Sequence, residues 1–438
     1  MSYKIIDLPA LGRPFNATDI IEVSANGTGS YKANIGNFTL GGENYIFVNA
    51  NGTPAQNGAA LKSAYLYAQT LTPNGSPLQE TNRITILLAP GYYTFNEAVD
   101  GPFEVNQSFI DFESLSGNPD VYFSSIQVYG SPIVGLDVRL IGIDTTKNNY
   151  YPHAAFAVAS IGDTGSEYIV IKNCVGGDYS FSSFSKGFYG LYENCIGGEY
   201  SFCSTGFGTS SPAGIISTAT GNFSNYGIIK NCTASDYSFV SGAFLPAGTI
   251  ANFGTIQSCN STGNTSFCHS VFRAQNAGAI IDCQSYDFSF CTSTDSIGTG
   301  SASNIGAIVN CQVYGAGFCV YLGANVSPTC AQNQGLISGC YSSGTGAFVI
   351  NESLSLGTNS ATITNCFMTG QGFCGANGIN SGIISNCTAQ NNSFCNDTPS
   401  GNSGQILRCT LLNDAFTVGA TGGGRVVLGI DTTGVVNF

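Results

Sequence analysis

A short pattern built on cysteine and phenylalanine recurs between residues 174 and 416 of this 438-residue chain. The stretch GIIKNCTASDYSF at 227–239 returns almost unchanged as GIISNCTAQNNSF at 382–394. Ten cysteines share one property, a phenylalanine seven or eight residues further on: Cys174, Cys195, Cys232, Cys259, Cys283, Cys311, Cys340, Cys366, Cys387 and Cys409. Successive members are 21 to 37 residues apart. A period of this size with variable insertions is typical of a solenoid.

The residue types in the repeat decide which solenoid it is. Its consensus is Gly-x-Ile-x-Asn-Cys, a short spacer, then Ser-Phe-Cys. The repeat region has no helical rhythm of apolar residues, but it has short β-branched pieces broken by Gly and Asn. These features predict an all-β fold, a right-handed parallel β-helix over 151–418. Its coils stack about 4.8 Å apart, so that like residues form columns.

The cysteines and phenylalanines are interpreted as a structural ladder inside this β-helix. Cys is a small residue that packs well when buried, and the phenylalanines Phe181, Phe202, Phe239 and Phe290 fill the wider part of the coil. The chain has no CxxC pair and only two histidines, so neither a metal site nor a cofactor is expected. Stacked thiols would lie within disulfide reach, but the first residues lack an apolar signal-peptide core, which favours free thiols.

The asparagine before six of the ten ladder cysteines predicts a sharp bend. In the coil around Cys232, Ile229 lies three residues upstream and therefore has the opposite parity along a strand. Both side chains point inward if Asn231 adopts the left-handed conformation that asparagine tolerates. We therefore predict an asparagine column at a turn between two strands, with amides able to hydrogen-bond along the stack.

The composition excludes two classes of partner. Only 9% of the residues are charged and the net charge is −13, so the chain lacks the basic clusters that bind a nucleic-acid backbone. The longest apolar runs are far shorter than the roughly 20 residues that span a bilayer. Neither nucleic-acid binding nor membrane insertion is expected.

The first third of the chain reads differently from the repeats. Two short apolar pieces, Ile20–Val23 and Tyr31–Ile35, flank an Asn-Gly-rich turn and predict a hairpin. Residues 1–48 are therefore interpreted as a small module for attachment or oligomerisation. The tail at 419–438 contains LGIDTTG, which is similar to IGIDTTK at 141–147, and it is interpreted as a C-terminal cap.

One segment has the apolar spacing of a helix. Residues 57–71, NGAALKSAYLYAQTL, place Leu61, Tyr65 and Ala68 on one face, with Asn57 as the candidate N-cap. We expect this helix to cover the open N-terminal end of the β-helix, where unpaired strand edges invite aggregation. Residues 49–150 would hold this helix and the first coils.

The N-terminal motifs resemble those of a known family. The stretch IIDLPALGRPFNATDIIEVSANGTGSYKANIGNF, at 5–38, is similar to the short N-terminal module of bacteriophage tail fibres and tailspikes. The helix followed by ITILLAPGYYTF resembles the entry into their pectate-lyase-like β-helix. The resemblance covers about the first 145 residues. It implies a virion protein, assembled in the host cytoplasm, that forms a homotrimer and binds other tail or virion proteins and a host surface glycan.

Candidate site residues lie just before the ladder phenylalanines. Asp178, Glu199 and Asp236 would stack on successive coils. Paired carboxylates are the catalytic groups of glycan hydrolases, so these acids are the catalytic candidates if the chain is an enzyme. The aromatic residues Tyr179, Tyr200 and Tyr237, with Asp287 in a later coil, are candidates for glycan binding. The competing interpretation is a solvated turn column, because Asp and Asn are turn formers and later coils carry Gly or Asn there.

Three functions follow from these observations. The first is a non-enzymatic phage tail fibre or virion appendage that recognises a host glycan. The second is a tailspike polysaccharide hydrolase or lyase that uses the stacked carboxylates. The third is a surface filament of a giant virus or an extracellular surface filament.

Overall fold

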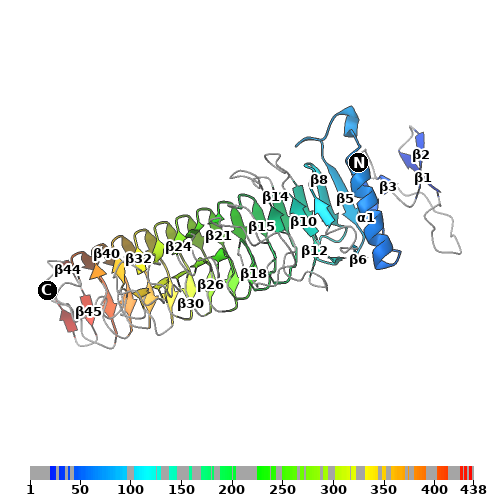
Figure 1. Cartoon of the computed structure of the whole chain (residues 1–438). Helices are drawn as coiled ribbons and strands as arrows, with labels where there is room; N and C mark the ends of the chain where they lie inside the picture. The colour runs from blue at the N-terminus through cyan, green and yellow to red at the C-terminus, as the bar shows by residue number, and fades with distance from the viewer. Residues whose placement is uncertain are drawn as a thin grey trace.

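The computed structural model shows a parallel β-helix, as the sequence predicts, with one α-helix among the described residues (Figure 1). The hand of the coil remains a prediction. The described residues are 20–25, 29–34, 38–39, 44–95, 103–124, 126–129, 138–145, 157–159, 169–178, 180–181, 188–199, 201–203, 224–236, 238–242, 249–263, 267–270, 273–286, 290–293, 301–315, 317–321, 331–343, 348–351, 357–369, 373, 379–390, 402–412, 425–427, 429–431 and 434–436.

The longest sheet, here called sheet 1, has 16 strands and runs along the whole solenoid. Its strands in order are β3 (Phe38–Thr39), β4 (Tyr45–Val48), β5 (Ile84–Leu88), β8 (Ile110–Ser114), β11 (Val138–Ile141), β14 (Ile169–Lys172), β15 (Leu191–Glu193), β17 (Ile228–Lys230), β21 (Thr255–Gln257), β25 (Ala279–Ile281), β29 (Ala307–Val309), β33 (Leu336–Ser338), β37 (Thr362–Thr364), β40 (Ile383–Ser385), β42 (Gln405–Leu407) and β44 (Arg425–Val427).

Three further sheets complete the repeating coils. Sheet 2 has 10 strands: β18 (Thr233–Ala234), β22 (Asn260–Ser261), β26 (Gln284–Ser285), β30 (Gln312–Val313), β34 (Tyr341–Ser342), β38 (Phe367–Met368), β41 (Thr388–Ala389), β43 (Thr410–Leu411), β45 (Gly429–Asp431) and β46 (Gly434–Val436). Sheet 3 has five: β19 (Ser241–Gly242), β23 (His269–Ser270), β27 (Cys291–Ser293), β31 (Cys319–Tyr321) and β35 (Val349–Asn351). Sheet 4 has seven: β16 (Ser224–Asn225), β20 (Thr249–Asn252), β24 (Arg273–Asn276), β28 (Ser301–Asn304), β32 (Ala331–Asn333), β36 (Thr358–Asn359) and β39 (Ile379–Asn380).

The first coils form two small sheets beside sheet 1. One joins β7 (Phe103–Val105), β10 (Ile126–Tyr129) and β13 (Ala157–Ala159), and the other joins β6 (Gly91–Tyr93), β9 (Val121–Phe123) and β12 (Ile143–Asp144). Near the N-terminus, β1 (Ile20–Ala25) and β2 (Gly29–Asn34) pair antiparallel, which is the hairpin that the sequence predicts. β4 already belongs to sheet 1, so the strands of the solenoid begin upstream of residue 49.

Each repeat bends where the asparagine column predicts. The residue before each ladder cysteine has a positive φ, for example 52° at Asn231 and 54° at Asn310. This corner turns the chain from sheet 1 into sheet 2, and it lets the isoleucine and the cysteine on either side both face inward. The exposed amides bond along the stack, with Asn194 Nδ2 donating to Asn173 Oδ1 at 3.1 Å and Asn231 Nδ2 donating to Asn194 Oδ1 at 3.1 Å.

A second asparagine ladder lies in the core, and the sequence analysis missed it. Its eight members end the strands of sheet 4 or hold the equivalent place in the last coil, and all are buried: Asn225, Asn252, Asn276, Asn304, Asn333, Asn359, Asn380 and Asn402. In the first seven, Nδ2 donates to the Oδ1 of the next coil at 2.8–2.9 Å. Buried amides are stable only when paired, so each asparagine requires another asparagine in the coil above.

A glycine column follows the buried asparagines, and close backbone approach explains it. A Cβ on Gly306 would lie 2.1 Å from the carbonyl oxygen of Gly278 in the preceding coil. Ala361 occupies this column in a later coil, and there the bond from Thr362 N to Gly335 O lengthens to 3.3 Å. The corresponding bond from Leu336 N to Gly306 O is 2.9 Å.

Helix α1 (Pro54–Ala68) lies across the N-terminal end of the solenoid (Figure 1) and contacts β4, β5 and β6. The prediction of Asn57 as N-cap is wrong. Thr53 is the N-cap, and it forms a capping box with Gln56, with a proline in the first turn. Asn57 is buried inside the helix instead, where its Nδ2 donates to the carbonyl oxygen of Tyr92 at 2.9 Å.

The C-terminal end closes with a change of strand direction. β44 and β45 add in parallel to sheets 1 and 2, and β46 then pairs antiparallel with β45. An antiparallel last strand breaks the in-register stacking that a further coil would need. Among the described residues, no helix has the length and apolar character required to cross a membrane.

The glycine column predicts a position-specific loss of stability. Gly306→Ala should lower the free energy of unfolding by about 1–3 kcal/mol, because the new Cβ must displace a backbone carbonyl. Ala307→Ser, at the outward-facing neighbour, should change it by less than about 0.5 kcal/mol. Urea unfolding followed by circular dichroism measures both, and equal effects would remove the close-approach explanation.

The buried asparagines predict a difference between the middle and the end of their ladder. Asn304→Ala removes two buried ladder bonds, the one from Asn276 Nδ2 and the one to Asn333 Oδ1, and should cost about 2–5 kcal/mol. Asn402→Ala removes one ladder bond, and Asn402 Nδ2 already has no hydrogen-bond partner, so its cost should be clearly smaller. Urea midpoints that are equal for the two variants would contradict the ladder.

Candidate functional site

The structure brings the three predicted acids together. Parallel bridges between Val175, Ile196 and Thr233 put three successive coils in register. Asp178, Glu199 and Asp236 follow these bridges by three residues each, so they occupy equivalent positions in adjacent coils. Tyr179, Tyr200, Tyr237 and Asp287, the predicted glycan-binding residues, lie outside the described residues.

The two aspartates of this column lie against the backbone of the next coil. Asp178 Oδ1 accepts a hydrogen bond from the backbone N–H of Glu199 at 2.9 Å. A Cβ on Gly263 would lie 1.7 Å from Asp236 Oδ1, so that carboxylate also lies against the following coil. Carboxylates that accept backbone N–H bonds stabilise turns. This geometry agrees with the interpretation of the column as turn formers.

Glu199 has a different electrostatic environment. Partial loss of hydration, and then the negative charges of Asp178 and Asp236, raise the pKa of the Glu199 carboxyl. A carboxyl with a raised pKa can hold a proton at higher pH than usual, which is what a general acid requires. Within the described residues, no cluster of three or more His, Cys, Asp or Glu side chains has a geometry that could hold a metal ion.

The ten ladder cysteines all lie inside the coil, at 0–2% exposure. Their thiols donate to backbone carbonyls at the left-handed corner, as when Cys232 Sγ approaches Lys230 O at 3.2 Å. The fourteen cysteines within the described residues are free thiols. Burial raises the pKa of the thiols of Cys174, Cys203 and Cys268, because a thiolate would lose its hydration.

The phenylalanines form a continuous internal stack. Phe181, Phe202, Phe239 and Phe290 are fully buried. Ring centroids of successive coils are 4.7 Å apart for Phe181 and Phe202 and 5.2 Å apart for Phe290 and Phe318. Several members also have a positive φ, for example 59° at Phe239. The stack therefore marks a second left-handed corner, which the sequence analysis did not predict.

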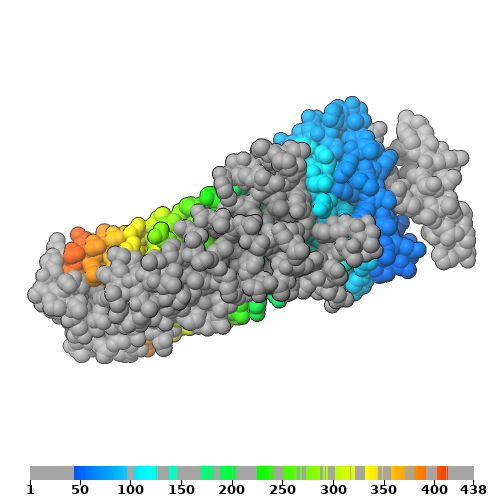
Figure 2. Space-filling view, viewed as in Figure 1, coloured from blue at the N-terminus to red at the C-terminus, as the bar shows by residue number. Residues whose placement is uncertain are grey.

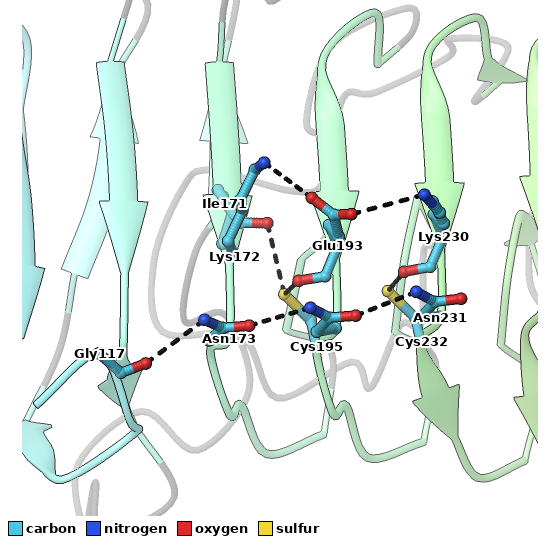
Figure 3. A network of polar contacts seen from close by, with 10 residues as sticks. Gly117, Ile171, Lys172, Asn173, Glu193, Cys195, Lys230, Asn231 and Cys232 are labelled. Carbon is cyan, nitrogen blue, oxygen red and sulfur yellow. Dashed lines mark hydrogen bonds and ion pairs between the residues drawn. The ribbon is translucent and has the colours of Figure 1, made fainter.

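A charge ladder on the outer face of sheet 1 was also not predicted. Lys172, Glu193 and Lys230 are direct neighbours on β14, β15 and β17. Lys172 Nζ is 2.7 Å and Lys230 Nζ is 3.7 Å from the Glu193 carboxylate, above the exposed asparagine column (Figure 3). The bond from Lys172 lowers the pKa of Glu193. The sequence signal for this charge ladder was the lysine or glutamate that lies two residues before the ladder cysteine in three successive repeats.

Exposed apolar side chains form a line on either side of the glycine column. We call this line the apolar stripe, and its members are Tyr226, Ile228, Phe253, Ile305, Leu336 and Ile383. Each is 37–46% exposed, and Tyr226 and Phe253 stack at 4.8 Å. The stripe follows the junction of sheets 4 and 1. In Figure 2 the described coils form a coloured edge of the solenoid that runs from green to orange. The signal for the stripe in the sequence was the repeated Asn-x-Gly-x pattern, in which the residue before or after the glycine is apolar in several coils.

Searches with this chain against family models, curated proteins and solved structures found no match.

The buried thiols predict a chemical test of the ladder. At pH 8 in the folded protein, iodoacetamide should leave Cys203 and Cys268 unmodified, because their thiols are buried and their pKa is raised. After unfolding in guanidinium chloride, all seventeen cysteines should react. Peptide mapping by mass spectrometry compares the two states. Modification of either cysteine in the folded protein would show that the column is open to solvent.

Proposed function

We propose that this chain is a structural, non-enzymatic virion appendage, such as a bacteriophage tail fibre, that contacts a host cell surface. The observation that carries the proposal is the unbroken stacking from β4 to β45, which makes a rod with different ends (Figure 1). α1 covers one end and the β45–β46 hairpin closes the other. A rod of this kind suits a spacer between a particle and a cell. The N-terminal resemblance to tail fibres and tailspikes adds support.

We propose that the working form is a homotrimer. The apolar stripe supports this, because exposed apolar surfaces of this length usually mark protein contacts. Three copies arranged about an axis parallel to the solenoid would cover the stripe along its whole length, since each copy has the same coil spacing. The β1–β2 hairpin would then attach the trimer to other virion proteins. The free thiols agree with assembly in the host cytoplasm.

A tailspike glycan hydrolase or lyase is the second candidate, and one observation favours it. Asp178, Glu199 and Asp236 are stacked, and the pKa of Glu199 is raised. The backbone bond to Asp178 explains at least one of these acids without catalysis. We therefore rank the binding role above the enzymatic one.

The appendage role predicts a location and a mass. Antibodies against the chain should label the tail of purified particles of the encoding virus in electron microscopy. Native mass spectrometry of the purified chain should give a trimer. Ile228→Asp with Leu336→Asp should shift it to monomer, whereas Ile196→Asp, at an exposed site on another face, should not. Labelling absent from particles would contradict the appendage role, and a monomeric wild-type chain would contradict the trimer.

The enzymatic candidate has its own assay. Host capsule polysaccharide incubated with the protein should show neither new reducing ends nor loss of viscosity. Cleavage by the wild-type chain that Glu199→Gln or Asp236→Asn abolishes would overturn the non-enzymatic proposal.

A further inference from the structure

Four aromatic side chains stand together on the outer face of sheet 2. Tyr286, Tyr314, Tyr341 and Phe367 come from four consecutive coils, on or directly after β26, β30, β34 and β38. The rings of Tyr286 and Tyr314 stack with centroids 5.1 Å apart, and those of Tyr341 and Phe367 stack at 5.5 Å. Tyr286 is 50% and Tyr314 is 40% exposed. The coils on either side carry polar, non-aromatic residues at the matching positions, so the aromatic cluster is local.

Two glutamine amides lie within the same cluster. Gln284 and Gln312 are neighbours on β26 and β30, in the row that continues to Tyr341 and Phe367. Gln312 Oε1 accepts bonds from Tyr314 Oη at 3.0 Å and from Gln284 Nε2 at 3.4 Å. All six side chains are uncharged. The surface therefore offers aromatic rings beside fixed amide donors and acceptors.

The orientation of the rings decides how a ligand can use them. Rings stacked along the solenoid axis turn their edges to solvent and cover one another's faces. The four rings form two stacked pairs in two rows, Tyr286 with Tyr314 and Tyr341 with Phe367, so faces stay uncovered only at the ends of each pair. The coil before Tyr286 carries Thr262 at the same position, and the coil after Phe367 carries Thr388. These short side chains leave open the face of Tyr286 toward the N-terminal coils and the face of Phe367 toward the C-terminal coils. The two rings are about 14 Å apart along the axis at roughly 4.8 Å per coil.

We propose that this surface binds an uncharged oligosaccharide lying along the solenoid axis. One sugar ring stacks on the open face of Tyr286 and another on that of Phe367, since the electron-rich face of an aromatic ring attracts polarised C–H groups. Gln284 and Gln312 bond the sugar hydroxyls between them. This inference rests on the proposed function and specifies the chemistry of its glycan.

The charges of the molecule select among glycans. The chain has a net charge of −13, which repels polysaccharides rich in uronate, sialate or sulfate. The six side chains at the surface offer no cation to compensate for a bound anion. An uncharged glycan is not repelled by the negative charge of the chain. The proposed ligand class is therefore neutral hexoses, deoxyhexoses and N-acetylhexosamines.

A glycan array tests the proposal with the full-length protein. The array should hold uncharged oligosaccharides of hexoses, deoxyhexoses and N-acetylhexosamines beside uronate-containing and sialylated ones. The wild-type chain should bind uncharged members only. Tyr286→Ala with Phe367→Ala should weaken the dissociation constant for the best ligand at least tenfold. Tyr286→Phe keeps the ring face and should bind like wild type.

Two controls separate binding from folding and from the fibre role. Tyr92→Ala removes a similarly exposed stacked ring from the first coils, far from the cluster and outside the apolar stripe, and should not change binding, and unchanged urea midpoints show that each variant folds. Wild-type binding only to charged glycans, no binding to the array, or unchanged binding by the double variant would each overturn the proposed surface. Antibody labelling of the virion tail would still stand in those cases, so this failure is distinct from failure of the appendage role.

Discussion

The in-register stacking of parallel coils is the constraint on which the rest of this structure depends. Parallel strands about 4.8 Å apart put each residue directly over its equivalent, so a choice made in one coil restricts the next. An asparagine buried at Asn304 is stable because Asn276 and Asn333 supply its partners. A glycine at Gly306 is needed because the Gly278 carbonyl lies beneath it. The repeat in the sequence is therefore a record of vertical contacts.

The two asparagine ladders point their amides in opposite directions. In the buried ladder each side chain donates toward the C-terminal coils, as from Asn252 to Asn276. In the exposed ladder each donates toward the N-terminal coils, as from Asn231 to Asn194. Aligned amide dipoles add along a column, and opposed columns offset one another. A long solenoid can thus use two ladders without building up a dipole from them, while both corners of sheet 1 are held by amides.

The sequence predicted the columns that use a chemically distinctive residue with fixed spacing. Cysteine, phenylalanine and the asparagine before cysteine were each found in this way, together with the left-handed corner. The buried asparagine ladder was missed because the chain is rich in asparagine, and only a count from the glycine, as in Asn225 to Gly227, separates core members from loop members. The N-cap was misplaced at Asn57 because the apolar pattern starts there, whereas the Thr53–Gln56 capping box sets the start of α1.

The outer faces could not be read in the same way, because stacking constrains them less. An inward position must match its neighbours in size and hydrogen bonding, but an outward position has solvent above it and tolerates change from coil to coil. The sheet 2 surface shows this freedom, since glutamine, tyrosine and phenylalanine succeed one another from Gln284 to Phe367 while the inward neighbours remain buried. A departure from the repeat on the outside is not required by the fold. Such departures are therefore the places where a solenoid of this kind can carry recognition.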